Sequence, residues 1–242
     1  MNDKSYTIEH LGSATVAWQK GLRHKFYEDR YRLLCRPIPL VAQAGRGEIF
    51  AICDGVGSAP KGMAAAQEVC NILVRFFENT RELPATSESI CFLLNQANAE
   101  IFSWGLIEGT SRPQGACAVT IIWIDADWAA HIFHAGDTSA ILIRDGIAQP
   151  LSSCHHSPDG HLNNYFGRPS LQLETKVVQL EEGDRLLLLT DGITKALYNQ
   201  QIVDLVEVQR TRQSSLSSLL SASRAAGSGD DATAVLVDIE TV

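Results

Sequence analysis

The sequence lacks long apolar runs, and this absence argues against an integral membrane protein. Its longest uninterrupted apolar segments, such as residues 121–124 and 186–189, fall far below the roughly 18 residues that a membrane-spanning helix needs. The first ten residues are polar and contain no apolar segment of the kind found in secretory signals. We therefore expect a cytoplasmic protein without a membrane partner.

Clustered cysteines are also missing. The chain has six cysteines, and no two of them are spaced as Cys-x-x-Cys. Zinc ribbons and disulfide frameworks need clustered thiols, so we expect neither. Scattered thiols in apolar surroundings are typical of a protein kept in reducing cytosol.

Runs of basic residues are absent as well. The chain holds 20 Lys+Arg against 28 Asp+Glu, a net charge of −8, and its pI is about 5.3. This balance argues against a nucleic-acid partner. No repeat or linker divides the 242 residues, and a hydrophobic content of 45% is enough for a sizeable core. We expect one domain over residues 1–242, and a monomer.

Three catalytic loops do not occur. The chain has no Cys-x5-Arg loop of cysteine phosphatases, no Gly-x-Ser-x-Gly elbow and no Walker A lysine loop. The stretch Gly55-Val56-Gly57 matches a dinucleotide fingerprint only in part, because Pro60 stands where the third glycine would be.

What the sequence does contain is strands and helices in separate blocks. Strand patterns cover residues 6–18, 31–36 and 48–53, and helical spacing follows over residues 62–77 and 87–104. β-Branched and aromatic runs around an Asp145-Gly146 turn predict an antiparallel meander over residues 116–124, 129–135 and 138–143. Further strands are expected at 171–180, 185–190 and 233–239, and helices at 194–208 and 214–225. This order predicts an α+β fold with sheets at the centre and helix pairs outside.

Acidic residues stand at the ends of several predicted strands. Asp54, Asp137 and Asp191 each end such a pattern beside a glycine, and Asp230-Asp231 opens another strand. Each of these acids could simply form a turn or a cap. If packing brings them to one edge, their repulsion requires cations between them, and oxygen ligands favour Mg²⁺ or Mn²⁺.

The acidic motifs follow one another in a recognisable order. They are Asp54-Gly55-Val56-Gly57, Gly136-Asp137-Thr138, Thr190-Asp191-Gly192-Ile193 and Asp230-Asp231-Ala232-Thr233. Upstream stand Gly21-Leu22-Arg23-His24 and Tyr27-Glu28-Asp29. In this order the motifs resemble the metal-dependent protein phosphatases (PPM type, protein phosphatase 2C-like), and the resemblance covers nearly the whole chain.

The resemblance implies a four-layer α-β-β-α sandwich of two antiparallel sheets, with a cleft for two Mn²⁺ or Mg²⁺ ions at one edge. Asp54 would bridge the ions, and the Gly55 carbonyl would ligate one of them. The other implied ligands are Asp191, Asp230, Glu28 and Asp29. The implied activity is a serine/threonine protein phosphatase in which a metal-bridging water attacks the phosphoryl group directly. Its partner would be a phosphoprotein that a kinase modifies.

Two positions depart from the family pattern. His24 replaces an arginine that contacts the substrate phosphate in many relatives, with Arg23 and Lys25 beside it. We expect His24, Arg23 and Asp29 to act in catalysis; the alternative for His24 is a neutral surface histidine. Lys195 stands where an aspartate would bind a third metal together with Asp137. Because an ammonium cannot ligate a cation, we expect Lys195 to pair with Asp137 and the third site to be weak or absent.

Other interpretations stay open from the sequence. His155, His156 and His161 could bind a transition metal or could belong to a polar loop. Two further functions fit the same fold: a phosphoprotein-binding pseudophosphatase, which the third-site lysine favours, and a metal-dependent hydrolase of a small phosphorylated metabolite.

Overall fold

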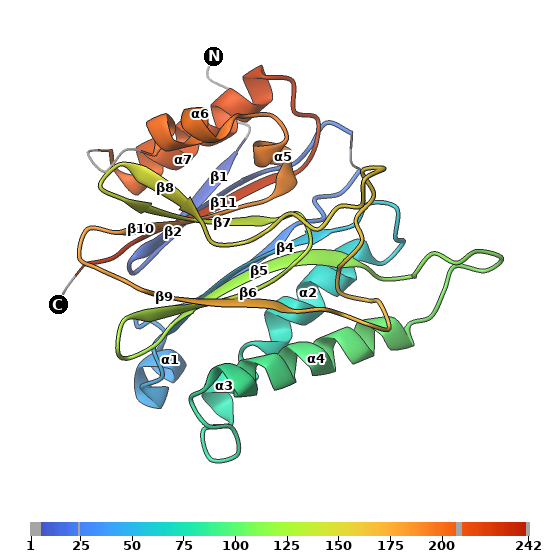
Figure 1. The fold of residues 1–242 in the computed structure, drawn as a ribbon, viewed down its shortest axis with the longest axis horizontal. Helices are drawn as coiled ribbons and strands as arrows, with labels where there is room; N and C mark the ends of the chain where they lie inside the picture. Colours follow the sequence, from blue (N-terminus) through green and yellow to red (C-terminus); the bar gives the residue numbers. More distant parts are fainter. Residues whose placement is uncertain (1–5, 24, 207–209, 241–242) are drawn as a thin grey trace.

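Two antiparallel sheets stacked face to face form the centre of the protein (Figure 1). The computed structural model describes residues 6–23, 25–206 and 210–240. The first sheet has the strand order β1 (Thr7–Leu11), β2 (Ala14–Gln19), β11 (Ala232–Asp238), β10 (Arg185–Leu189), β7 (Ser139–Arg144) and β8 (Ile147–Pro150). The second has the order β3 (Arg30–Leu34), β4 (Glu48–Gly55), β5 (Cys117–Ile124), β6 (Ala129–Ala135) and β9 (Glu174–Gln179).

Helices cover the outer face of each sheet (Figure 1). The second sheet packs against α1 (Pro39–Ala44), α2 (Gly62–Ile72), α3 (Arg75–Glu78) and α4 (Ser87–Ser103). The first sheet packs against α5 (Asp191–Thr194), α6 (Asn199–Leu205) and α7 (Arg212–Ala225). The predicted α+β sandwich of four layers is therefore confirmed. No helix in the described ranges is both long and apolar enough to cross a membrane.

Successive side chains of the central strands point alternately to the two faces of each sheet, and both faces are covered. On β4, Phe50 and Ile52 point into the cluster between the sheets, whereas Ala51 and Cys53 point towards the helices. All four are fully buried, because successive strand residues face opposite sides and each side is covered. The core thus holds the strand ends rigidly in register.

The predicted strand over residues 6–18 is wrong in one respect, because it is a hairpin of β1 and β2. The chain turns at Gly12, which has a positive φ of 57°. Such a conformation strains any residue with a Cβ, so glycine allows the turn.

The predicted meander is also wrong, because β7 does not pair with β6. It pairs with β10 and β8 in the first sheet, whereas β6 pairs with β5 and β9 in the second. The crossing is made at Gly136, whose φ is 129° and where an added Cβ would lie 2.3 Å from the Ala118 Cβ. This crossing places Asp137 between the two sheets at one edge.

Two of the predicted helices are shorter or divided in the structure. The pattern over residues 62–77 divides into α2 and α3, and that over 194–208 contains α6 alone, after the single turn of α5. The helix α1 and the edge strand β8 were not predicted, because both are too short for a periodicity to be seen.

Candidate metal centre at one edge of the sandwich

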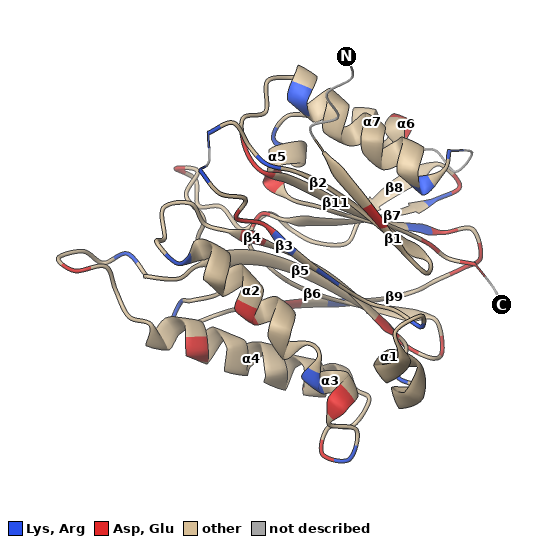
Figure 2. Cartoon of the chain, turned by 180° about the vertical axis from the view of Figure 1, so that it is seen from behind, with Lys and Arg blue, Asp and Glu red and all other residues tan. Residues whose placement is uncertain are grey.

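Strand register gathers the acidic motifs at one edge. Gly55 at the end of β4 pairs with Cys117, and Leu189 at the end of β10 pairs with Ser139 and Ala234. Antiparallel pairing therefore puts the ends of β4, β6 and β10 beside the start of β11. Figure 2 shows acidic positions where β4 ends and α5 begins.

Asp54 is the acid most affected by its neighbours. Its pKa is raised well above the ordinary range by burial first, and then by the charges of Asp29, Asp191 and Asp137. A raised pKa means that the ionised carboxylates destabilise one another. Positive charge placed between them would relieve this cost.

Asp29 reaches the same cluster from the loop before β3, and it is fully buried. Its Oδ2 accepts hydrogen bonds from the Thr233 hydroxyl at 2.6 Å and the Thr190 hydroxyl at 3.0 Å. Its Oδ1 is buried without a hydrogen-bond partner among the described residues. Burial raises the pKa of Asp29 to about 8, with the charges of Asp231 and Asp191 adding to the rise and the two hydroxyls opposing it. A buried, unpartnered carboxylate oxygen suits a metal ion or its coordinated water.

Asp231 organises the first motif. Its Oδ1 accepts from the Gly21 amide and its Oδ2 from the Glu28 amide, both at 2.6 Å. The neighbouring Arg23 amide donates to the Gly229 carbonyl at 3.1 Å. These bonds hold Gly21, Arg23 and Glu28 against the start of β11.

Arg23, Asp191 and Asp230 line one small cavity of about 210 Å³ together with Lys195. The structure thus brings Arg23 and Asp230 next to Asp191, as the sequence predicts. Glu28 is partly buried and lies in the same loop as Asp29.

Two glycines permit the close approach of these segments. A Cβ on Gly55 would lie 2.7 Å from the Gly62 backbone, and one on Gly192 would lie 1.9 Å from the Asp231 carbonyl oxygen. Neither backbone contact could accommodate a side chain. The Asp-Gly pairs therefore serve packing as well as chemistry.

Lys195 occupies the place of the third-site ligand. Its Nζ contacts Asp191 and lies 3.4 Å from the Asp137 Oδ2, so the predicted pairing with Asp137 is confirmed. Burial alone would lower the pKa of Lys195, but the hydrogen bond and charge of Asp191, helped by Asp137, raise it. His156 also contacts the Asp137 Oδ2, at 3.1 Å.

The three histidines of the loop before β9 contact different partners. His156 contacts Asp137, His155 lies 3.2 Å from Glu174, and His161 is exposed. The nitrogens of His134 and His155 and a Glu174 oxygen lie within 4.8 Å of one another. Each of these histidines already has hydrogen-bond partners: Thr120 and the Ser153 carbonyl for His134, and the Gly136 amide for His155. These contacts assign the cluster a structural role in holding the loop before β9 against the end of β6. His24, the remaining predicted catalytic residue, lies outside the described residues.

Sequence analysis missed the groups that hold the acids in place. Thr190, Thr233 and His156 are not acids, and only the tertiary structure brings them to Asp29 and Asp137. The Thr-Asp-Gly and Asp-Asp-Ala-Thr motifs contain both threonines, and this was the available signal.

The donor set fits hard divalent cations. The converging side chains of Asp54, Asp29 and Asp191 offer carboxylate oxygens, and Oδ1 of Asp29 is buried without a hydrogen-bond partner among the described residues. Oxygen-only sites select Mg²⁺ or Mn²⁺ over zinc or copper.

Comparison with known proteins agrees with this geometry. The family described as protein phosphatase 2C matches residues 37–228. Among curated relatives, a probable protein phosphatase 2C 14 of Arabidopsis thaliana is 23% identical over 81% of this chain and 49% of its own length. The serine/threonine phosphatase stp of Listeria innocua is 21% identical over 78% of this chain and 84% of its own.

Solved structures show the same fold. The serine/threonine phosphatase Stp1 of Staphylococcus aureus has a TM-score of 0.78 at 17% identity, covering 94% of this chain and 95% of its own. The phosphatase PstP/Ppp of Mycobacterium tuberculosis has a TM-score of 0.75 at 18% identity, covering 94% and 98%. The chain spans about half the length of the Arabidopsis relative and 65% of that of a rice relative, a probable protein phosphatase 2C 74. The family match covers well over half of the chain, including Asp54, Asp137 and Asp191, and the chain belongs to the protein phosphatase 2C family.

Proposed function

We propose that the chain is one catalytic domain, a serine/threonine protein phosphatase that depends on Mn²⁺ or Mg²⁺. The observation that carries this proposal is the crowding of Asp54, Asp29 and Asp191 at the edge of the sandwich, where burial and the negative charge of Asp191 raise the pKa of both Asp54 and Asp29. Such a cluster is unfavourable for folding alone and becomes useful when cations bind it. The names of the Listeria and Staphylococcus relatives support phosphoserine and phosphothreonine as the substrate class.

Two ions would be held by Asp54, the Gly55 carbonyl, Asp191 and Asp230, with Glu28 and Asp29 holding a ligand position or coordinated waters. Bound there, the cations would supply Lewis acidity, lower the pKa of a bridging water and neutralise phosphoryl oxygens for an in-line displacement. The chain's own contribution is to hold these oxygens in register, through Thr190, Thr233 and the backbone bonds of Asp231.

We propose that Arg23 attracts the substrate phosphate, because it lines the same cavity as Asp191 and Asp230, whereas the other cation there, Lys195, pairs with Asp137 and Asp191. We propose the same role for His24, on its place in the first motif. A net charge of −8 repels phosphoproteins at long range, so local cations must provide the attraction.

Lys195 provides a fixed positive charge beside Asp137 and Asp191. We therefore propose a centre of two cations, with the third site weak or absent. A monomeric cytoplasmic enzyme acting against a protein kinase is the cellular role that we propose.

The test is hydrolysis of an aryl phosphate and a phosphothreonine peptide by chelator-stripped protein, with and without added Mn²⁺. We expect turnover only with Mn²⁺, and a loss of at least ~10²-fold in Asp54→Asn because a metal ligand is removed. Asp145→Asn is the matched control, since Asp145 is exposed at a turn that asparagine also tolerates. Turnover in the presence of chelator would contradict the proposal, and Mn²⁺-dependent binding of the phosphopeptide without turnover would indicate a pseudophosphatase.

A further inference from the structure

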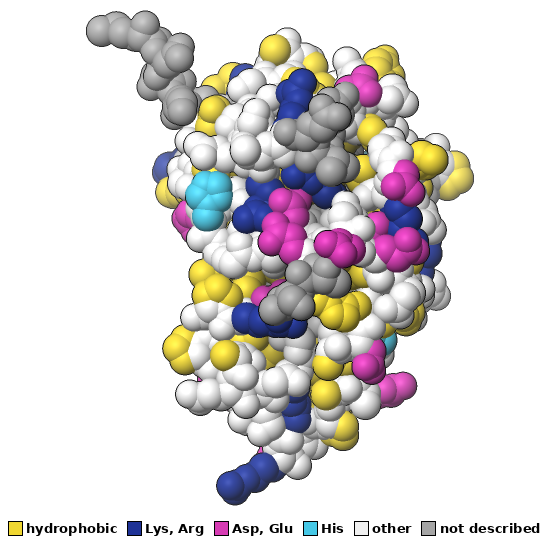
Figure 3. Space-filling model, turned by 90° about the vertical axis from the view of Figure 1, so that its left-hand side faces the viewer, with side chains coloured by type: hydrophobic (Ala, Val, Ile, Leu, Met, Phe, Trp, Pro, Cys, Tyr) yellow, Lys and Arg dark blue, Asp and Glu magenta, His cyan; other side chains and the backbone are white. Residues whose placement is uncertain are grey.

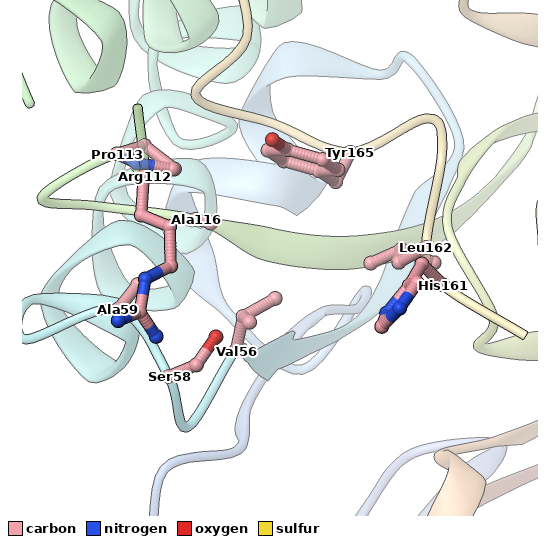
Figure 4. A pocket seen from close by; sticks show the side chains of 9 residues that line it. All are labelled: Val56, Ser58, Ala59, Arg112, Pro113, Ala116, His161, Leu162 and Tyr165. Atoms are coloured by element: carbon pink, nitrogen blue, oxygen red, sulfur yellow. The ribbon is translucent and has the colours of Figure 1, made fainter. Parts of the chain in front are cut away.

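A cavity of about 320 Å³ opens directly beside the candidate metal centre (Figure 4). Three segments line it: the loop between β4 and α2, with Val56, Ser58 and Ala59; the loop before β5, with Arg112; and the loop before β9, with Tyr165. Val56 is two residues from Asp54, so the cavity wall lies within about 7 Å of chain from the metal ligand.

The cavity is held open by backbone bonds. The Val56 amide donates to the Ala116 carbonyl at 2.9 Å, and Cys117 and Phe166 exchange hydrogen bonds of 3.2 and 2.9 Å. Ala59 and Ala116 are buried in its floor. Because its walls are tied to β5 and to one another, the cavity exists before any ligand arrives, and binding there would cost little ordering.

The rim of the cavity is cationic. The Arg112 guanidinium is exposed and has no hydrogen-bond or ion-pair partner among the residues that the structure describes. It points towards Ser58, with Tyr165 across the cavity and His161 on the third side (Figure 4). A second guanidinium, that of Arg168, lies 5.9 Å from the centre of the Tyr165 ring. His161 lies 4.0 Å from the exposed carboxylate of Asp159.

Arg112 has no carboxylate partner among the described residues, although the chain carries eight more acidic than basic residues. Elsewhere Arg144, Arg185 and Arg212 each pair with a carboxylate. A guanidinium left without a partner beside a preformed cavity is suited to an anionic group supplied by a ligand.

We propose that this cavity is a substrate subsite that binds an anionic side chain close to the phosphoserine or phosphothreonine, with Arg112 as its main contact. The inference rests on the proposed phosphatase function and adds a specificity determinant to it. An extended peptide rises about 3.3 Å per residue, so the anionic residue stands within about three positions of the phosphoresidue. A carboxylate and a second phosphate share the required chemistry.

The test compares phosphothreonine peptides that carry Glu, Gln or phosphoserine at one position, scanned from −3 to +3. We expect wild-type kcat/KM to be about fivefold to tenfold higher for Glu than for Gln at one position, as for a partly desolvated ionic hydrogen bond. Arg112→Gln should abolish this ratio, and Arg112→Lys should keep part of it. The phosphoserine arm tells whether a second phosphate replaces the carboxylate.

Arg75→Gln is the matched control. Arg75 is a surface arginine of α3 that donates a hydrogen bond to Gln96 of α4. This variant should leave the Glu/Gln ratio unchanged. A ratio near one in the wild type at every position, or the same ratio in the wild type and Arg112→Gln, overturns the subsite.

Aryl phosphate turnover by the wild type distinguishes failure of the subsite from failure of the proposed phosphatase function, since a small substrate does not reach the subsite. If the wild type hydrolyses no phosphate ester, the Glu/Gln preference is measured by binding instead. Fluorescence anisotropy of the same labelled peptides, with Mn²⁺ present, gives a Kd for each peptide. A Gln/Glu ratio of Kd values near one in the wild type, or an equal ratio in the wild type and Arg112→Gln, overturns the subsite.

Discussion

The acidic side chains at the two ends of the sandwich have different partners. At the end away from the metal centre, the Arg144 guanidinium donates to both oxygens of the buried Asp184 at 2.8 and 2.6 Å. Arg185 and Arg212 each lie 2.9 Å from the carboxylate of Asp238. Figure 3 shows basic and acidic side chains intermixed on this face.

At the metal centre, the acids have one another as neighbours. Hydroxyls and amides hold Asp29 and Asp231, and the cations nearest Asp191 are Lys195 and Arg23. The same strands β7, β10 and β11 contribute to both ends. This comparison indicates that acids which only stabilise the fold form ion pairs with arginines of the chain. Acids without an arginine partner are instead available to bind an external cation.

The largest expected change in stability is at the end of the sandwich that holds the Arg144–Asp184 ion pair. Arg144→Ala leaves the Asp184 carboxylate buried without its partner, and we expect the free energy of unfolding to fall by about 2–4 kcal/mol. Urea denaturation measures this change. Arg75→Ala, which removes an exposed arginine, should stay within about 0.5 kcal/mol; equal effects of the two substitutions would contradict the distinction between the ends.

At the metal centre, we expect a substitution to raise the free energy of unfolding instead of lowering it. In chelator-treated protein, Asp29→Asn removes a buried like charge and keeps an oxygen to accept from Thr190 and Thr233, so stability should rise by about 1–3 kcal/mol. Added Mn²⁺ should reverse the order, because it stabilises the wild type more than the variant. A loss of stability in chelator would show that Asp29 is a structural acid.

The pH dependence of this difference follows from the pKa of Asp29, which is about 8 in the folded chain against an ordinary value of 3.8. Between these two values the unfolded chain has released a proton that the folded chain retains, so stability falls as pH rises. The advantage of Asp29→Asn should thus be small at pH 4 and should grow up to about pH 8. Chemical denaturation at four pH values checks it, and a constant advantage would refute the linkage.

The smallest expected effect concerns Lys195. Lys195→Asp exchanges an internal cation for a carboxylate beside Asp137, and we expect one additional, weakly bound Mn²⁺. Electron paramagnetic resonance counts bound Mn²⁺, and Lys195→Gln is the control that removes the charge without adding a ligand. If the wild type already holds a third ion at Asp137 as firmly as the first two, Lys195 is not the obstacle.

Sequence periodicity predicted the layers because alternating and helical patterns record which side of each element is buried. It failed where single backbone positions decide the course of the chain: Gly12 divides one expected strand, and Gly136 sends β7 to the other sheet. Asp54, Asp137, Asp191 and Asp230 could be predicted from their place at strand ends, whereas Glu28 and Asp29 were expected only from the resemblance to the phosphatase family. Their partners could not, since the Asp29 to Thr233 bond joins residues 204 positions apart.

The most direct test of the account is calorimetric titration of Mn²⁺ into chelator-stripped wild-type protein and Asp54→Asn. We predict two ions per wild-type chain and the loss of at least one in the variant, since Asp54 lies close enough to Asp29, Asp191 and Asp137 for their charges to raise its pKa. Binding of no Mn²⁺ by the wild type, or equal number and affinity in the two proteins, would contradict the claim that this edge is built for cations.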